Sequence, residues 1–304
     1  MRRPWRRDGD LTRMSPPRAF LAHAYRRLLH RPLTPPDAPV ITFAIPLVGK
    51  DRAEDWDNTC ARLSDTLRSV RSQDHGRVEV IVCGQDRPDG FPASEGERFL
   101  PVPHFEAAAG RSDRRDKMRA IARDMARQGG FRYVVTLDAD DIVHPGLCRF
   151  VAQDNNGRGY LIDKGYIIGP AGRVALLDPV AKPFAFWDFC GSCAILAVDL
   201  DRQALPAWYL GQFASRHHEF RAIAAAHGYP LDTVPFPAAL YIFDHGTNAS
   251  IRYGRAGGKW SYLRDHALPA AEARAVLAEF GHRLRPRPDQ ASMATGDSRL
   301  STIA

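Results

Sequence analysis

The segment Phe131-Arg-Tyr-Val-Val-Thr-Leu-Asp-Ala-Asp-Asp141 decides the fold class, because an apolar, β-branched run ends there in three carboxylates. The run from Tyr133 to Leu137 is typical of a strand covered on both faces, and the basic helical segment before it favours a parallel α/β crossover. Ligands of open α/β sheets bind at the carboxyl ends of strands, where this acidic cluster falls. Carboxylate oxygens suit Mg²⁺ or Mn²⁺, which are often shared with nucleotide phosphates. The alternative is an acidic turn of solvated side chains, since Asp commonly ends strands.

The composition is that of a globular protein whose charge is concentrated near its start. The chain has 304 residues, 44% of them hydrophobic, which is enough for one large α/β domain or two small ones. The formal net charge is +7, and residues 1–40 hold nine Arg and three Asp, a net of +6, which leaves about +1 for the rest. A nearly neutral body argues against nucleic-acid binding, which favours a basic face on the folded domain.

The five cysteines and the hydropathy pattern indicate a cytoplasmic protein. An odd number of cysteines in apolar patterns favours buried thiols in a reducing compartment. We find no stretch with the roughly 20 apolar residues of a membrane span and no signal peptide.

Residues 1–39 are expected to form a basic arm that contains a short amphipathic helix over residues 16–33 and a Pro-rich linker. The apolar positions on one face of this helix are Phe20, Leu21, Ala24, Tyr25, Leu28 and Leu29. Two interpretations remain open. The helix could lie on the inner face of a membrane as a peripheral contact. Alternatively, it could pack on its own domain or on a second subunit, and its short apolar face favours this second interpretation.

Residues 40–282 are expected to form one α/β domain, and residues 283–304 a disordered tail rich in Pro, Ser and Arg. The first half of the domain is predicted to form a doubly wound sheet, with strands at 40–46, 78–83 and 131–137 and helices at 56–70 and 112–128. Its second half predicts short strands at 160–163, 166–168 and 174–177 that resemble a small antiparallel layer. Further strands are predicted at 193–198 and 239–243, and helices at 215–226 and 268–281.

Several short motifs occur in a particular order along residues 40–255. They are Ile45-Pro46, a βαβ unit, Lys117 before the Asp-x-Asp strand end, a Gly-Ser strand entry, a Gly-Tyr-Pro helix exit and His245-Gly-x-Asn-x-Ser250. Asp-x-Asp alone occurs widely by chance, but this order and spacing resemble a family 2 type glycosyltransferase of the A fold. The resemblance implies a glycosyltransferase-A-like fold, a Rossmann-like doubly wound mixed sheet with a small antiparallel acceptor-side layer. It also implies a hexosyltransferase-like enzyme that moves a sugar from a UDP- or GDP-linked donor to a hydroxyl of a glycan, lipid or small molecule.

The resemblance further implies a site for Mn²⁺ or Mg²⁺. Asp140 is expected to bind the metal, Asp138 to reach the ribose or the metal, Asp141 to orient its neighbour, and His245 to complete the ligand set. The expected nucleotide-sugar contacts are Pro46, Leu47, Val48, Asp86, Lys117, Asp138 and Ala139. The expected acceptor-side residues are Trp187, Gly191 and Ser192. Arg114 could also steady phosphate, although an exposed helix position is the simpler interpretation.

The sequence departs from the family pattern at two places. Cys83-Gly-Gln-Asp86 stands where a pair of acidic residues is usual. His218-Glu219 stands where inverting members carry a Glu-Asp pair, so the catalytic base is expected to be Glu219 or His218, unless the enzyme retains configuration.

Other classes fit the sequence less well. An Asp-x-Asp phosphohydrolase would carry the motif near the start of its domain, and a sugar-nucleotide pyrophosphorylase would have a Gly-rich loop after the first strand. A non-catalytic nucleotide-sugar-binding relic of the same fold remains open. A redox or zinc site at Cys190-Gly-Ser-Cys193 is disfavoured, because a strand rather than a helix follows and no nearby pair supplies further ligands.

Overall fold

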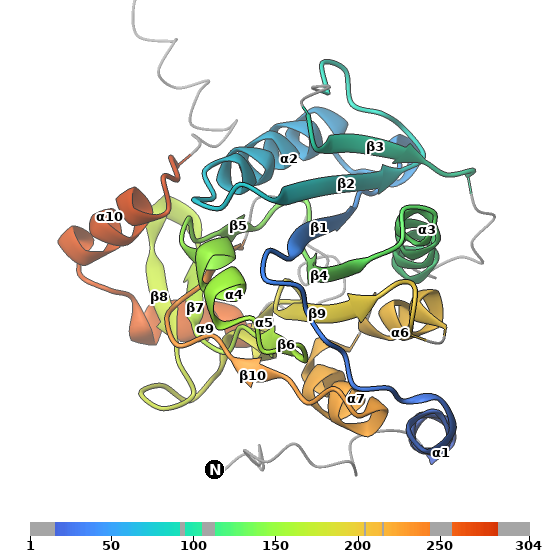
Figure 1. The fold of residues 1–304 in the computed structure, drawn as a ribbon. Coiled ribbons are helices and arrows are strands. Elements are labelled where there is room, and N and C mark those ends of the chain that lie inside the picture. Colours follow the sequence, from blue (N-terminus) through green and yellow to red (C-terminus); the bar gives the residue numbers. More distant parts are fainter. Residues whose placement is uncertain are drawn as a thin grey trace, which may run out of the picture.

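The computed structural model of the protein describes residues 16–91, 95–104, 113–203, 205–214, 216–243 and 257–284. A seven-stranded mixed sheet forms its centre, in the order β10-β6-β9-β4-β1-β2-β3 (Figure 1). The strands are β1 (Val40–Pro46), β2 (Val78–Gly84), β3 (Glu97–Pro101), β4 (Phe131–Thr136), β6 (Gly159–Leu161), β9 (Ala194–Asp199) and β10 (Asp232–Thr233).

The pairing in this sheet is parallel except around β9. Strand β1 pairs in parallel with β2 and β4, and β2 pairs in parallel with β3. Strand β9 runs antiparallel to both of its neighbours, β4 and β6, and β10 is parallel to β6. This arrangement confirms the predicted α/β class with a large mixed sheet.

A second sheet has the order β5-β11-β7-β8. Its strands are β5 (Ile142–Val143), β7 (Gly165–Ile168), β8 (Val174–Leu177) and β11 (Ala239–Ile242). Pairs β7/β8 and β5/β11 are antiparallel, whereas β7 and β11 are parallel. The predicted strand at 160–163 was wrongly grouped with this layer. Its residues form β6, which pairs with β9 in the large sheet because Tyr160 and Leu161 are buried on both sides.

Helices cover both faces of the large sheet (Figure 1). The helices are α1 (Pro16–Leu29), α2 (Trp56–Arg71), α3 (Arg114–Ala126), α4 (Leu147–Asp154), α5 (Phe186–Phe189), α6 (Pro206–Gly211), α7 (Phe220–His227), α9 (Gly257–His266) and α10 (Ala270–Glu279), with 3₁₀ turns η2 (Lys50–Arg52), η3 (Pro170–Gly172), η4 (Gln212–Ala214) and η5 (His217–Glu219). The apolar stripe predicted for α2 is the face that packs, since Leu63, Leu67 and Val70 are buried. Among the described residues, no helix has the length and apolar character needed to cross a membrane.

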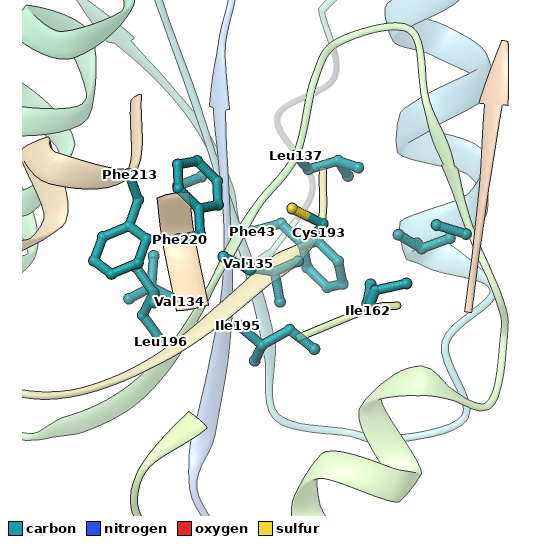
Figure 2. Close-up of a cluster of buried hydrophobic side chains, with 14 of the residues drawn as sticks. Phe43, Val134, Val135, Leu137, Ile162, Cys193, Ile195, Leu196, Phe213 and Phe220 are labelled. Atoms are coloured by element: carbon teal, nitrogen blue, oxygen red, sulfur yellow. The ribbon is translucent and has the colours of Figure 1, made fainter. Parts of the chain in front are cut away.

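Strand β4 is buried on both faces, which fixes the position of the acidic segment that follows it. Val134 pairs with Leu196 and Val135 with Ile195 across to β9. Successive side chains of a strand point to opposite faces, and Figure 2 shows Phe213 and Phe220 on the side of Val134 and Leu196, with Phe43 on the side of Val135 and Ile195. Each such buried side chain contributes roughly 1.5–3 kcal/mol, so the exit of β4 is a rigid platform.

Candidate active site

Three carboxylates gather where the chain leaves β4. The Leu137 N–H still donates to Ala44 O at 3.1 Å, which holds the exit against β1. The chain then turns, with the Asp141 N–H 3.3 Å from Asp138 O. Asp138, Asp140 and Asp141 each offer a carboxylate oxygen, and these oxygens lie within 4.8 Å of one another. The sequence-predicted cluster is therefore one group in space, at the edge where α/β sheets bind ligands.

Asp141 is the buried member of this cluster. One carboxylate oxygen accepts from Ser192 Oγ at 2.5 Å and from the Cys190 thiol at 3.0 Å. The other oxygen lies 3.4 Å from the Ile242 N–H. Burial, followed by the charges of Asp140 and Asp138, raises the pKa of Asp141 well above its usual value. With both oxygens engaged, Asp141 holds the 190–192 turn against the acidic loop.

Asp138 lies beside Gly191 and Ser192 of the same turn. It is partly open to solvent, with 28% of its side chain exposed. Its N–H donates to Ser192 Oγ at 2.9 Å, and its carboxylate is paired with Arg114. Burial raises the pKa of Asp138, Arg114 opposes the rise and Asp140 adds to it. A Cβ on Gly191 would lie 3.6 Å from both Asp138 and Arg114, so the predicted acceptor-side turn borders the cluster.

Two cations face the carboxylates, and the sequence analysis considered only one of them, Arg114, for a role in the site. Arg114, for which an exposed helix position was the favoured interpretation, is instead paired with Asp138 at the start of α3. Lys259, at the start of α9, donates to Phe189 O and to the Tyr241 hydroxyl, both at 2.9 Å. Burial lowers the pKa of Lys259 to about 8, while the charges of Cys190 and the three acids work in the opposite direction. The ammonium therefore lies within electrostatic reach of the whole cluster.

The turn η5 brings a third group that the sequence analysis passed over. The ring of His217 is hydrogen-bonded through Nδ1 to Trp187 O. Because a carbonyl can only accept, Nδ1 carries the proton and Nε2 holds a lone pair. Burial lowers the pKa of His217 to about 4, helped by the charges of His218, Lys259 and Arg114. His217 is thus a neutral base within electrostatic reach of both cations.

The two residues predicted as the base have different surroundings. Glu219 is buried, and its carboxylate lies 3.1 Å from Arg216 and 4.0 Å from His218 Nε2. His218 is exposed over nearly half of its side chain. Glu219 is therefore engaged by Arg216, and His218 faces solvent.

A buried polar network fixes the exit of β1. The Lys117 side chain is only 1% exposed, and its Nζ lies 2.5 Å from Leu47 O and 2.8 Å from the Asp113 carboxylate. Gln85 Nε2 donates to the same carboxylate at 2.8 Å, and the Leu47 N–H donates to Cys83 O at 2.8 Å. The ammonium of Lys117 therefore holds the loop after β1, which favours a structural role over contact with phosphate.

The remaining predicted nucleotide contacts lie along the same edge. Pro46 ends β1, Val48 is exposed, and Ala139 is half-buried inside the acidic turn. Asp86 accepts from the Lys50 N–H at 2.7 Å. With Asp51 and His104 it forms a second group of possible ligand atoms within 4.8 Å of one another.

Two further predictions concern Trp187 and His245. Trp187 is half-buried, packs against the core, and receives the His217 hydrogen bond through its carbonyl. His245, predicted as the third metal ligand, lies outside the described residues.

Comparisons with known proteins give structural likeness only. No protein-family model matches the sequence. No curated protein matches it either. The S. aureus TarS 1–349 structure is 13% identical, with a TM-score of 0.38, 87% of this chain covered and 76% of that chain.

Two other solved structures show similar scores. The glycosyltransferase GlyE of Streptococcus pneumoniae TIGR4 is 11% identical, with a TM-score of 0.36, and the match covers 77% of this chain and 53% of that chain. A protein from Desulfovibrio desulfuricans G20, described as a nucleotide-diphospho-sugar transferase, is 10% identical, with a TM-score of 0.34 and coverages of 75% and 99%. Because all three TM-scores lie below 0.5, we base the function on the geometry of this chain.

Proposed function

We propose that the protein is a metal-dependent glycosyltransferase that moves a sugar from a nucleoside-diphosphate sugar to a hydroxyl acceptor. The observation that carries this proposal is the carboxylate cluster at the carboxyl end of β4, faced by Arg114 and Lys259. A cluster of anions faced by cations suits a ligand that is itself a metal–phosphate complex. The exits of β1 and β2 lie along the same edge of the sheet, where a nucleoside would bind.

The donor set fits Mn²⁺ or Mg²⁺. Asp138 and Asp140 supply hard oxygen ligands, whereas Asp141 is engaged by Ser192 and Cys190. Burial first, and repulsion between the acids in addition, raises the pKa values of Asp138 and Asp141, and a divalent cation would relieve the repulsion. When bound, such an ion would neutralise charge on the leaving diphosphate. His245 remains a predicted further ligand.

The diphosphate would lie between the acids and the cations. Arg114 can exchange its bond to Asp138 for a two-pronged contact to phosphate once a cation occupies the carboxylates, and Lys259 can act as a point charge on the same group. The nucleoside would follow the β1 and β2 exits, with Asp86 accepting from a base N–H. Gln85 Oε1 is a buried acceptor without a hydrogen-bond partner in the described structure, and it could take a second N–H. The other contacts that we propose are Pro46, Leu47, Val48 and Ala139.

The acceptor hydroxyl would approach over the 187–192 segment, with Trp187, Gly191 and Ser192 forming that wall. A base would take the hydroxyl proton while the oxygen bonds to the anomeric carbon and the bond from that carbon to the diphosphate oxygen breaks. Glu219 and His218 are the bases suggested by the resemblance. We favour His217 Nε2, because the bond from Nδ1 to Trp187 O leaves the lone pair of the ring on Nε2.

Calorimetry with UDP and GDP, each with and without Mn²⁺, tests the donor site. We expect one nucleotide to bind only with the metal, and Asp140→Ala to abolish this binding. Asp265→Ala is the control, since Asp265 is an exposed acid on α9 that pairs with Arg264. Binding of neither nucleotide with metal present would refute the proposal and favour an Asp-x-Asp phosphohydrolase.

The catalytic base is tested separately, by measuring turnover of sugar donors that carry the nucleotide found to bind. We expect His217→Asn to lower kcat at least about a hundredfold while the nucleotide affinity stays within twofold. His218→Asn and Glu219→Gln are the matched comparisons. If Glu219→Gln alone abolishes turnover in a folded protein, the assignment to His217 is wrong. Normal nucleotide binding with no turnover in the unaltered enzyme would favour the non-catalytic relic.

A further inference from the structure

Helix α1 has two apolar faces, and one of them packs against the rest of the domain. This inner face buries Ala22 and Tyr25 against the region of α6 and α7 (Figure 1). The Tyr25 ring centroid lies 5.4 Å from that of Trp208 and 5.1 Å from that of His227. The sequence-based alternative that the helix packs on its own domain is therefore confirmed for this face.

The chain after the helix is also tied to the domain. The Tyr229 hydroxyl donates to Arg31 O at 3.0 Å, and Asn155 Nδ2 donates to Pro36 O at 2.8 Å. These contacts fix the orientation of α1, so its other side points away from the domain in a defined direction.

That outer face is apolar. It consists of Phe20, Leu21, Ala24 and Leu28, which recur at the spacing of one helix side. Phe20 is 73% exposed, Leu21 53% and Leu28 76%. Of the nine exposed large hydrophobic side chains in the described part of the chain, four belong to this one helix, counting Leu29. Single exposed apolar residues need no explanation, but a cluster on one helix face marks an interaction surface.

The charges around the outer face select its partner. Arg27 borders this face, since it lies two helical turns after Phe20, and Arg31 is exposed just beyond the end of the helix; α1 itself contains no acidic residue. Residues 1–40 carry a net charge of +6. Two copies of this face would bring their arginines together, whereas an anionic surface would attract them. An apolar stripe with a basic border is the pattern of a helix that lies in the interfacial layer of a bilayer.

We propose that the outer face of α1 docks the protein on an anionic lipid bilayer, with Phe20, Leu21 and Leu28 entering the interface and the neighbouring arginines contacting lipid phosphates. The inner face stays on the domain during docking, so binding needs no rearrangement of the fold. This inference does not depend on glycosyl transfer.

Co-sedimentation with lipid vesicles tests the proposal on the full chain. We expect binding to vesicles of phosphatidylcholine with 30 mol% phosphatidylglycerol, chosen as roughly physiological in charge, and at least about tenfold weaker binding to phosphatidylcholine alone. Phe20→Ser combined with Leu28→Ser should weaken binding to the anionic vesicles at least about tenfold. Val180→Ser is the control, since Val180 is an equally exposed apolar residue elsewhere on the surface, and it should leave binding unchanged.

Three results would overturn the proposal. The first is equal binding of the Phe20/Leu28 variant and the unaltered protein, which would assign any binding to the basic arm alone. The second is no binding to either vesicle. The third is a dimer in sedimentation velocity that the double substitution dissociates, which would make a second copy the occupant. Thermal unfolding of the variant should match that of the unaltered protein, because both side chains are exposed.

Discussion

Replacing Lys117 with Met distinguishes a structural role of this lysine from a role as a phosphate ligand. The ammonium is buried between Leu47 O and the Asp113 carboxylate, and Met would leave that carboxylate without its closest cation. Breaking a buried ion pair by removing one partner costs about 3–5 kcal/mol. Asp113 keeps a hydrogen bond from Gln85 and a contact with Arg52 at 3.7 Å, so we expect the low end, about 3 kcal/mol. Urea denaturation of the variant measures this loss.

The matched variant is Lys117→Met with Asp113→Asn. Removing the charge of the partner should recover part of the lost free energy of unfolding, because the buried carboxylate is then no longer uncompensated. Nucleotide affinity should fall together with the free energy of unfolding in Lys117→Met, and the double variant should recover part of both. An unchanged free energy of unfolding in Lys117→Met, together with a large loss of nucleotide affinity, would refute the structural role and make Lys117 a phosphate ligand.

Three further outcomes follow from the site. Burial lowers the pKa of His217 from 6.5 to about 4, so between pH 6.5 and pH 4 the unfolded chain binds a proton at this ring and the folded protein does not. Stability should therefore fall by at most about 3 kcal/mol between pH 6.5 and pH 4, and His217→Asn should flatten this part of the pH–stability curve measured by urea denaturation. Lys259→Met should weaken metal-dependent nucleotide binding about tenfold in calorimetry with little loss of stability, whereas an unchanged affinity would remove Lys259 from the phosphate site. Ser192→Ala should cost about 2–4 kcal/mol in the same denaturation assay, since Asp141 loses a charge-assisted bond and the Asp138 N–H loses its acceptor; a cost under about 0.5 kcal/mol would contradict this arrangement.

The parts of the fold that the sequence predicted are those with a strong local pattern. Continuous β-branched runs gave β1, β2 and β4, and the four-and-three spacing gave α2. Strand β3 was missed because it is a half-buried edge strand without clear alternation. Helix α9 was missed because it begins with two glycines and buries only Tyr262 and Leu263. In both segments tertiary contacts, rather than local sequence, decide the structure.

The candidate site divides in the same way. Asp138 and Asp140 could be predicted because a strand end and its carboxylates are adjacent in sequence. Arg114, His217 and Lys259 come from three separate elements. Only the packing of α3, η5 and α9 brings Arg114 and Lys259 within reach of the acids and His217 within reach of those two cations. Lys117 shows the converse, since its place before Asp-x-Asp predicts a phosphate ligand, whereas its burial and its contacts with Leu47 O and Asp113 favour a structural role.

Crystals grown with Mn²⁺ and UDP or GDP would test the central claim most directly, through the anomalous scattering of the metal. The account predicts an anomalous peak about 2.1 Å from an Asp140 carboxylate oxygen, next to Asp138, with the diphosphate on its other side. A peak at the Asp51, Asp86 and His104 group alone, or no peak beside Asp140 in crystals that contain the nucleotide, would contradict it.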